Sequence, residues 1–169
     1  MVFLGGILFQ TIFFIIAKYT LDNYSYTYKL ISNYNLTILI FNLLPIIPLD
    51  GAKVLNIALN KLFSFKTSHL ISIYISYISI IILIIFVSNN LNMILMFILI
   101  LTLLIKEHKS HKYIFNKFLL ERYIKNIKFK SNNFIKNINL YKMKKYYNNI
   151  FIYKNKYIDE KEALSLKYH

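Results

Sequence analysis

Apolar stretches separated by short polar ones make up most of the chain before residue 106. Residues 1–17 are apolar except for one glutamine, residues 69–88 carry no lysine, arginine or carboxylate, and residues 91–105 are again mostly aliphatic. Because an α-helix rises about 1.5 Å per residue, about 20 apolar residues span the roughly 30 Å hydrocarbon core of a bilayer. The pattern predicts membrane helices over these three ranges, the last two joined by a turn at Asn89-Asn90. A cleaved signal peptide is the alternative for residues 1–17, but no basic residue precedes that run.

A fourth apolar stretch, Leu36–Leu49, is interrupted by the only two prolines of the chain and is followed by a carboxylate and a glycine. Its second half reads Asn42-Leu43-Leu44-Pro45-Ile46-Ile47-Pro48-Leu49-Asp50-Gly51. Each proline removes a backbone donor and obstructs the preceding helical turn, and lipid cannot satisfy the carbonyls that this frees. Such a segment is predicted to lie against other protein or a wet cavity.

Asp50 is the candidate functional residue of this stretch. An ionised aspartate near the bilayer centre costs about 2.5–3.5 kcal/mol, so it is expected to face a polar or metal-containing cavity. The alternative is that Asp50 only caps the helix that follows, since aspartate is a preferred N-cap. Gly51 then permits either a tight turn or the close approach of another backbone.

Composition agrees with a membrane protein. The 169 residues are 57% hydrophobic, with a mean hydropathy of +0.46 and no cysteine or tryptophan. Disulfides and thiolate zinc sites are therefore excluded, and any metal must be held by histidine and carboxylate.

The positive charge is concentrated near one end. The net charge is +14, and 16 of the 21 basic residues lie from Lys106 onward. Because lysine-rich segments stay cytoplasmic, residues 106–169 are expected to form a basic cytoplasmic tail. Lys53, Lys61 and Lys66 are expected on the same side, with a polar connection over residues 22–35 facing outward. Within the tail, residues 150–157 could form a short strand and residues 160–166 a short helix.

The stretch from Asn42 to Gly51 resembles the second conserved motif of the site-2 protease family, the intramembrane zinc metalloproteases, and is closest to the sporulation-type bacterial branch. The resemblance implies that Asp50 is the third protein ligand of the zinc. It implies that Asn42 helps to hold the substrate or the motif itself, with Pro45, Pro48 and Gly51 shaping the segment.

Two further stretches resemble the same family. Gly5-Gly6-Ile7-Leu8-Phe9-Gln10 is similar to an Ala-Gly-Pro-x-x-Gln/Asn stretch, without its proline. Phe118-Leu119-Leu120-Glu121-Arg122-Tyr123 is similar to the juxtamembrane sequence, after which a regulatory nucleotide-binding domain can follow in the family. The residues left are too few for that domain, and no glycine follows Gly51 to cradle a phosphate.

The chain lacks His-Glu-x-x-His, which supplies the family's general base and first two zinc ligands. In the family this motif precedes the glycine-containing stretch, so the chain is expected to begin just after the span that carries it. His69 is expected to be structural. His108 and His111 share a helical face beside Glu107, but the surrounding lysines repel a divalent cation.

The expected fold is an all-α membrane protein with about four transmembrane helices, one broken by proline, formed by residues 1–105 and followed by the tail. The expected function is that of a partial, multi-pass intramembrane zinc metalloprotease acting on membrane-protein substrates and inactive alone. The alternative is a non-catalytic degenerate protease that binds partner helices, or a membrane scaffold. For the tail, anionic lipid is the expected contact and nucleic acid is disfavoured, because base readout favours arginine and the chain has one.

Overall fold

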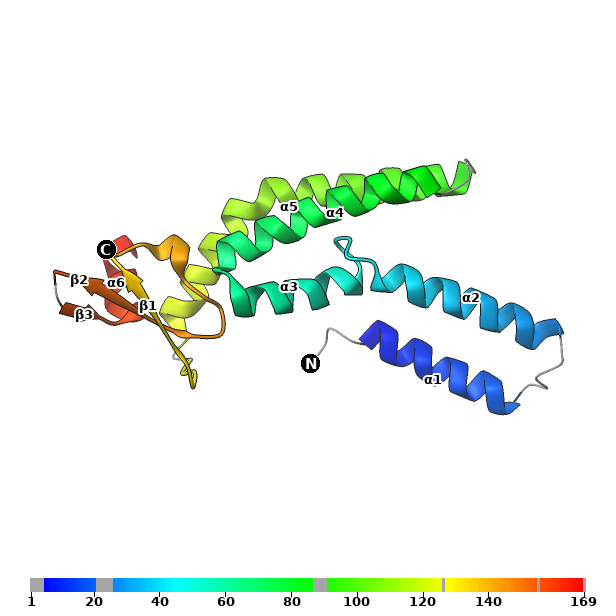
Figure 1. The fold of residues 1–169 in the computed structure, drawn as a ribbon, viewed down its shortest axis with the longest axis horizontal. Helices are drawn as coiled ribbons and strands as arrows, with labels where there is room; N and C mark the ends of the chain where they lie inside the picture. The colour runs from blue at the N-terminus through cyan, green and yellow to red at the C-terminus, as the bar shows by residue number, and fades with distance from the viewer. Residues whose placement is uncertain (1–4, 21–25, 87–90, 126, 155, 169) are drawn as a thin grey trace. The chain divides into compact units, whose positions relative to one another are not determined.

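The computed structural model describes residues 5–20, 26–86, 91–125, 127–154 and 156–168 (Figure 1). Most of these residues are helical, and a small sheet lies near the C-terminus. The chain divides into two compact units, which are described separately. We call residues 1–55 and 75–103 the helical unit, and residues 56–74 and 104–169 the α/β unit. In chain order the helices are α1 Gly5–Thr20, α2 Tyr26–Leu43, α3 Asp50–Leu62, α4 Phe65–Phe86, α5 Leu91–Ile124 and α6 Glu160–Tyr168.

The two long apolar helices confirm the predicted hairpin segments. Of the described helices, two are long and apolar enough to cross a membrane, namely Phe65–Ile85 of α4 and Leu91–Ile124 of α5. Both exceed their predicted ranges, because α4 starts at Phe65 and α5 continues well past Ile105. The predicted turn at Asn89-Asn90 lies outside the described residues. Ser72 and Ser76 are fully buried on α4.

Helix α2 corrects the prediction that residues 22–35 form a polar connection, because the described part from Tyr26 onward is helical. Helices α1 and α2 pack side by side (Figure 1). The polar side chains of α2 find partners within this pair: the Asn35 amide donates to the Gln10 carbonyl at 3.3 Å, and the Thr37 hydroxyl donates to the Asn33 carbonyl at 2.8 Å. These hydrogen bonds satisfy polar side chains of α2 while the segment remains helical.

The α/β unit corrects the all-α expectation, because the basic tail contains a three-stranded sheet. Its strands are β1 Asn132–Lys136, β2 Asn148–Tyr153 and β3 Lys156–Ile158, in the order β1-β2-β3. Strand β1 pairs parallel to β2, and β3 pairs antiparallel to β2. The predicted helix at 160–166 is confirmed as α6. The predicted strand at 150–157 is two strands, separated at Lys154, whose φ is positive at 47°.

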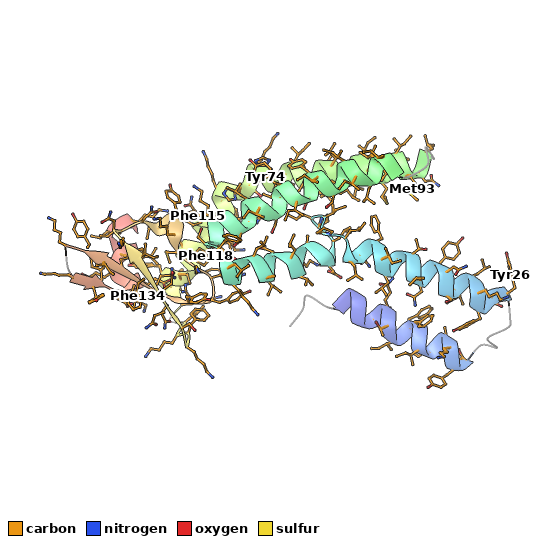
Figure 2. All side chains as sticks on the ribbon, in the orientation of Figure 1. Tyr26, Tyr74, Met93, Phe115, Phe118 and Phe134 are labelled. Carbon is orange, nitrogen blue, oxygen red and sulfur yellow. The ribbon has the colours of Figure 1, made fainter. Side chains whose placement is uncertain are left out.

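Helix α6 and the end of α5 cover the sheet and form one apolar core with it. Phe115 and Phe118 of α5, both labelled in Figure 2, belong to this core together with Phe151 of β2 and Leu164 of α6. The first residue of α4 also enters it. Phe65 stacks on Phe118 with ring centroids 4.2 Å apart, and the Phe65 amide donates to the Met143 carbonyl at 2.9 Å. The base of the helical hairpin is thereby part of the same folded unit as the tail.

Candidate functional site

The predicted break in the fourth apolar stretch is confirmed. Helix α2 ends at Leu43, residues 44–49 are not helical, and α3 starts at Asp50. The non-helical residues form compact turns of their own: the Ile46 amide donates to the Leu44 carbonyl at 2.8 Å, and the Leu49 amide donates to the Ile46 carbonyl at 2.6 Å. Ile46 is fully buried. Residues 44–49 therefore form a structured connection, which we call the broken segment.

Ser76 of α4 satisfies the backbone groups that the prolines leave without helical partners. Its hydroxyl accepts a hydrogen bond from the Ile47 amide at 3.1 Å and donates to the Pro45 carbonyl at 3.2 Å. Ser76 is itself fully buried. The sequence did not predict this partner. The two prolines could have indicated such a partner, because broken backbone at membrane depth needs hydrogen-bonding side chains nearby.

Gly51 allows two backbones to approach closely. A Cβ built on this residue would overlap the Leu43 carbonyl group and the Leu44 carbonyl oxygen. Its φ is not in the left-handed region. Of the two roles predicted for Gly51, the structure therefore confirms close approach. The absence of a side chain lets the start of α3 lie directly against the end of α2.

Asp50 stands at the first position of α3. Its carboxylate Oδ1 lies 2.7 Å from the Nζ of Lys53, one turn later, and the aspartate side chain is 15% exposed. A negative charge at a helix N-terminus interacts favourably with the helix dipole. The position is compatible with a capping role and equally with a ligand role, because the carboxylate remains partly accessible and its ion-pair partner is a flexible, half-exposed lysine.

The structure brings together residues from two of the stretches that resemble the family. The Asn42 amide Nδ2 of α2 lies 3.5 Å from the Gln10 Oε1 of α1. Gln10 also accepts through its carbonyl from Asn35, so it joins α1 to α2 at two points. Asn42 is thus held two residues before the broken segment begins.

The residues of this chain do not by themselves fit a zinc site. A catalytic zinc takes three protein ligands, and the part of the chain that the structure describes contains no group of three or more histidines and carboxylates able to hold a metal. Asp50 pairs with a cation instead.

His69, which was expected to be structural, meets His111 and Glu107 in the α/β unit, but in a geometry unsuited to a metal. His69 Nε2 lies 3.6 Å from Glu107 Oε1, and the rings of His69 and His111 stack with centroids 5.3 Å apart at 8°. Nitrogen lone pairs lie in the plane of each ring, so two stacked rings direct them along parallel lines rather than toward one ion. Sequence reasoning missed this contact because it joins α4 to α5 over about 40 residues.

The described residues thus contain two helices long and apolar enough to cross a membrane, and an aspartate that follows a proline-broken segment. Residues 2–86 match the sequence model of peptidase family M50, and the chain belongs to that family. It is 35% identical over 104 residues to Stage IV sporulation protein FB of Bacillus subtilis (strain 168). The match covers 59% of this chain and 36% of that protein, so the chain spans about a third of the relative's length.

Proposed function

We propose that this chain supplies the broken-segment part of a membrane-embedded zinc peptidase that cleaves membrane-protein substrates. Asp50 contributes one zinc ligand, and Asn42 holds the substrate or the segment. The observation that carries the proposal is the packing of the broken segment, in which Gly51 and Ser76 fix the backbone next to Asp50. Membership of family M50 supports it.

A second polypeptide segment is required for activity in this proposal. The 169 residues contain no His-Glu-x-x-His, so they offer neither the general base nor the two histidine ligands. The chain alone is expected to bind no stoichiometric zinc and to cleave nothing. A segment carrying His-Glu-x-x-His would complete the donor set together with Asp50.

Asp50→Ala is expected to weaken zinc binding in a complex of this chain with a co-expressed His-Glu-x-x-His segment. Changes in residues that merely support a ligand lower metal affinity about 10- to 100-fold, so loss of the ligand itself is expected to cost at least about 100-fold. The measurement is zinc content and affinity of the purified complex in detergent. Unchanged affinity in Asp50→Ala would show the ligand assignment to be wrong.

Asp50→Asn separates a ligand from a helix cap. Asparagine caps a helix N-terminus about as well as aspartate, but its neutral amide is a poorer zinc ligand. A ligand role predicts that Asp50→Asn loses zinc while α3 stays folded by circular dichroism. If Asp50→Asn keeps zinc and only Asp50→Ala loses it, Asp50 acts as a cap. Lys53→Gln is the matched control, because it removes the ion pair without removing the carboxylate and is expected not to weaken binding.

We propose four membrane crossings, with residues 1–105 embedded in the cell membrane and residues 106–169 cytoplasmic. The length of α2 supports a crossing rather than a re-entrant loop, since its 18 residues extend about 27 Å. Lysines at 53, 61 and 66 support the cytoplasmic placement of α3 and the start of α4.

Single cysteines test this topology, because the chain has none of its own. Ser25→Cys and Asn89→Cys are expected to react with an impermeant thiol reagent added to intact cells, whereas Ser64→Cys and Ser131→Cys are expected to react only after lysis. Labelling of Ser64→Cys in intact cells would overturn both the topology and the cytoplasmic-side placement of Asp50.

A non-catalytic role as a partner-helix binder or scaffold is the second candidate. The pairing of Asp50 with Lys53 favours it, because the lysine neutralises the charge of the carboxylate without a metal. The DNA upstream of Met1 distinguishes the two: an in-frame or frameshifted His-Glu-x-x-His there supports the peptidase, and its absence from the genome near this gene supports the non-catalytic role.

A further inference from the structure

The α/β unit contains a cavity of about 640 Å³ that the proposed peptidase function does not use. Three of its lining residues are lysines drawn from three helices: Lys66 of α4, Lys112 of α5 and Lys167 of α6. Among the residues that the structure describes, no aspartate or glutamate lines it. The cavity is therefore a concave site whose described charged residues are all cationic, in a size range that accommodates small ligands.

His111 gives this cavity an unused hydrogen-bonding group. It lines the cavity and is only 8% exposed, and neither of its ring nitrogens has a hydrogen-bond partner. One face of the ring is covered by His69, stacked at 5.3 Å. Buried polar groups in folded proteins are normally paired, and an exception calls for an explanation. A ligand with acceptor oxygens would provide the missing partner.

The aromatic wall holds a lysine in place without neutralising it. Phe115, labelled in Figure 2, stacks against Tyr141 with centroids 5.4 Å apart, and the Nζ of Lys66 lies 3.8 Å from the Tyr141 ring centroid. Lys167 donates to the neutral side-chain oxygen of Asn116 at 3.0 Å. The ammonium group of Lys66 is thus positioned by an uncharged ring, so its positive charge remains available to an anion.

We propose that this cavity binds a phosphate group, supplied by the headgroup of an anionic lipid. Phosphate offers several charged acceptor oxygens at once, which suits the ammonium groups of Lys66 and Lys112 and an imidazole N–H. The position along α5 favours a lipid source. His111 lies six residues after Ile105, where the apolar run ends, or about 9 Å along the helix. The polar headgroup layer is about 5–8 Å thick on each side of the hydrocarbon core, so His111 lies close to the outer edge of this layer.

The proposal is independent of Asp50 and zinc, and it needs only the hairpin of α4 and α5 to lie in the membrane. It also differs from a general attraction of the basic tail to anionic membranes, because it assigns the contact to particular residues. Lys117 provides the contrast: it lies on α5 like Lys112 and is similarly exposed, but it does not line the cavity.

The test measures binding of a short-chain phosphatidic acid to the purified full chain in neutral detergent micelles. Lys112→Gln and Lys66→Gln are each expected to weaken binding at least about fivefold, the change expected for one lysine acting on an anionic lipid, and Lys117→Gln by less than twofold. Short-chain phosphatidylcholine is expected not to compete. His111→Gln is expected to weaken binding as well, while the exposed Lys112→Gln variant provides a test that does not disturb the core.

Two results would overturn parts of the proposal. If Lys112→Gln and Lys117→Gln lose equal affinity for phosphatidic acid, the lipid is held by a diffuse electrostatic attraction and not by the cavity. If inorganic phosphate or glycerol 3-phosphate binds as tightly as phosphatidic acid, and Lys112→Gln weakens both equally, the phosphate site stands and the lipid source is wrong.

Discussion

Arg122→Ala is expected to destabilise the α/β unit by roughly 3–5 kcal/mol, the usual cost of removing one partner from a buried ion pair. Arg122, the sole arginine of the chain, is 6% exposed. Its Nε lies 2.6 Å from the Oε1 of Glu160 as an ion pair, and its Nη2 donates to Glu160 Oε2 at 3.0 Å and to the Tyr147 carbonyl at 2.5 Å. The pair joins the end of α5 to the start of α6.

The expected loss is large because Glu160 also holds β2. Its Oε2 accepts from the backbone amide of Asn149 at 3.3 Å and from the Asn149 side chain at 3.2 Å, and Asn149 is fully buried. Without Arg122 the carboxylate would remain buried with no counter-ion, and the network that orders β2 against α6 would weaken with it. Hydrogen-bonded groups of this kind are costly to leave half satisfied.

Hydrogen exchange of the β2 amides in the full chain measures this loss locally, without unfolding the membrane helices. Arg122→Ala is expected to accelerate exchange at Phe151 and Ile152, whereas Lys117→Ala, which removes an exposed cation from the same helix, is expected to change it little. In Glu160→Gln the exchange rate is expected to lie between those of the two other variants, because the glutamine side-chain oxygen can still accept hydrogen bonds from Asn149. Equal exchange in Arg122→Ala and Lys117→Ala would contradict the structural role assigned to the ion pair.

The helices and the break were predictable because their signals are local. A run of apolar residues long enough to span a bilayer identifies α4 and α5, and two prolines identify the broken segment. Strand β1 was missed because five residues, Asn132–Lys136, carry too short a pattern. Its pairing partner β2 starts at Asn148, so the information that makes it a strand is not local.

The site shows the same division between local and non-local information. The motif singled out Asp50 and Gly51, and one of the two roles anticipated for Gly51 is confirmed. The hydrogen bonds of Ser76 to the broken segment and the stacking of His69 on His111 depend on which helices pack together, and residue spacing along one helix does not determine that. The zinc-ligand role of Asp50 remains a prediction, because its observed partner is Lys53.

Gly51→Ala is expected to disrupt the broken segment, although helix propensity alone predicts the opposite. Alanine is favoured over glycine in a helix by about 1 kcal/mol, so the substitution would stabilise α3 if nothing stood nearby. The added methyl, however, would overlap the carbonyl groups of Leu43 and Leu44. These are backbone atoms of the last residue of α2 and the first residue of the broken segment, and they cannot rotate away as a flexible side chain would. Overpacking in a tight interior costs about 1–3 kcal/mol, so the clash is expected to outweigh the gain in propensity.

Exchange of the Ile47 and Leu49 amides measures this effect, because both are bonded within the broken segment or to Ser76. A net cost of 1–2 kcal/mol would accelerate their exchange about 5- to 30-fold if they exchange by local opening. Ala58→Gly is the matched control: it lowers helix propensity at an exposed position of α3 by about the same 1 kcal/mol, and is expected to leave these two amides unchanged. Slower exchange in Gly51→Ala would mean that propensity outweighs the clash and that the close approach of α3 to the end of α2 does not require glycine.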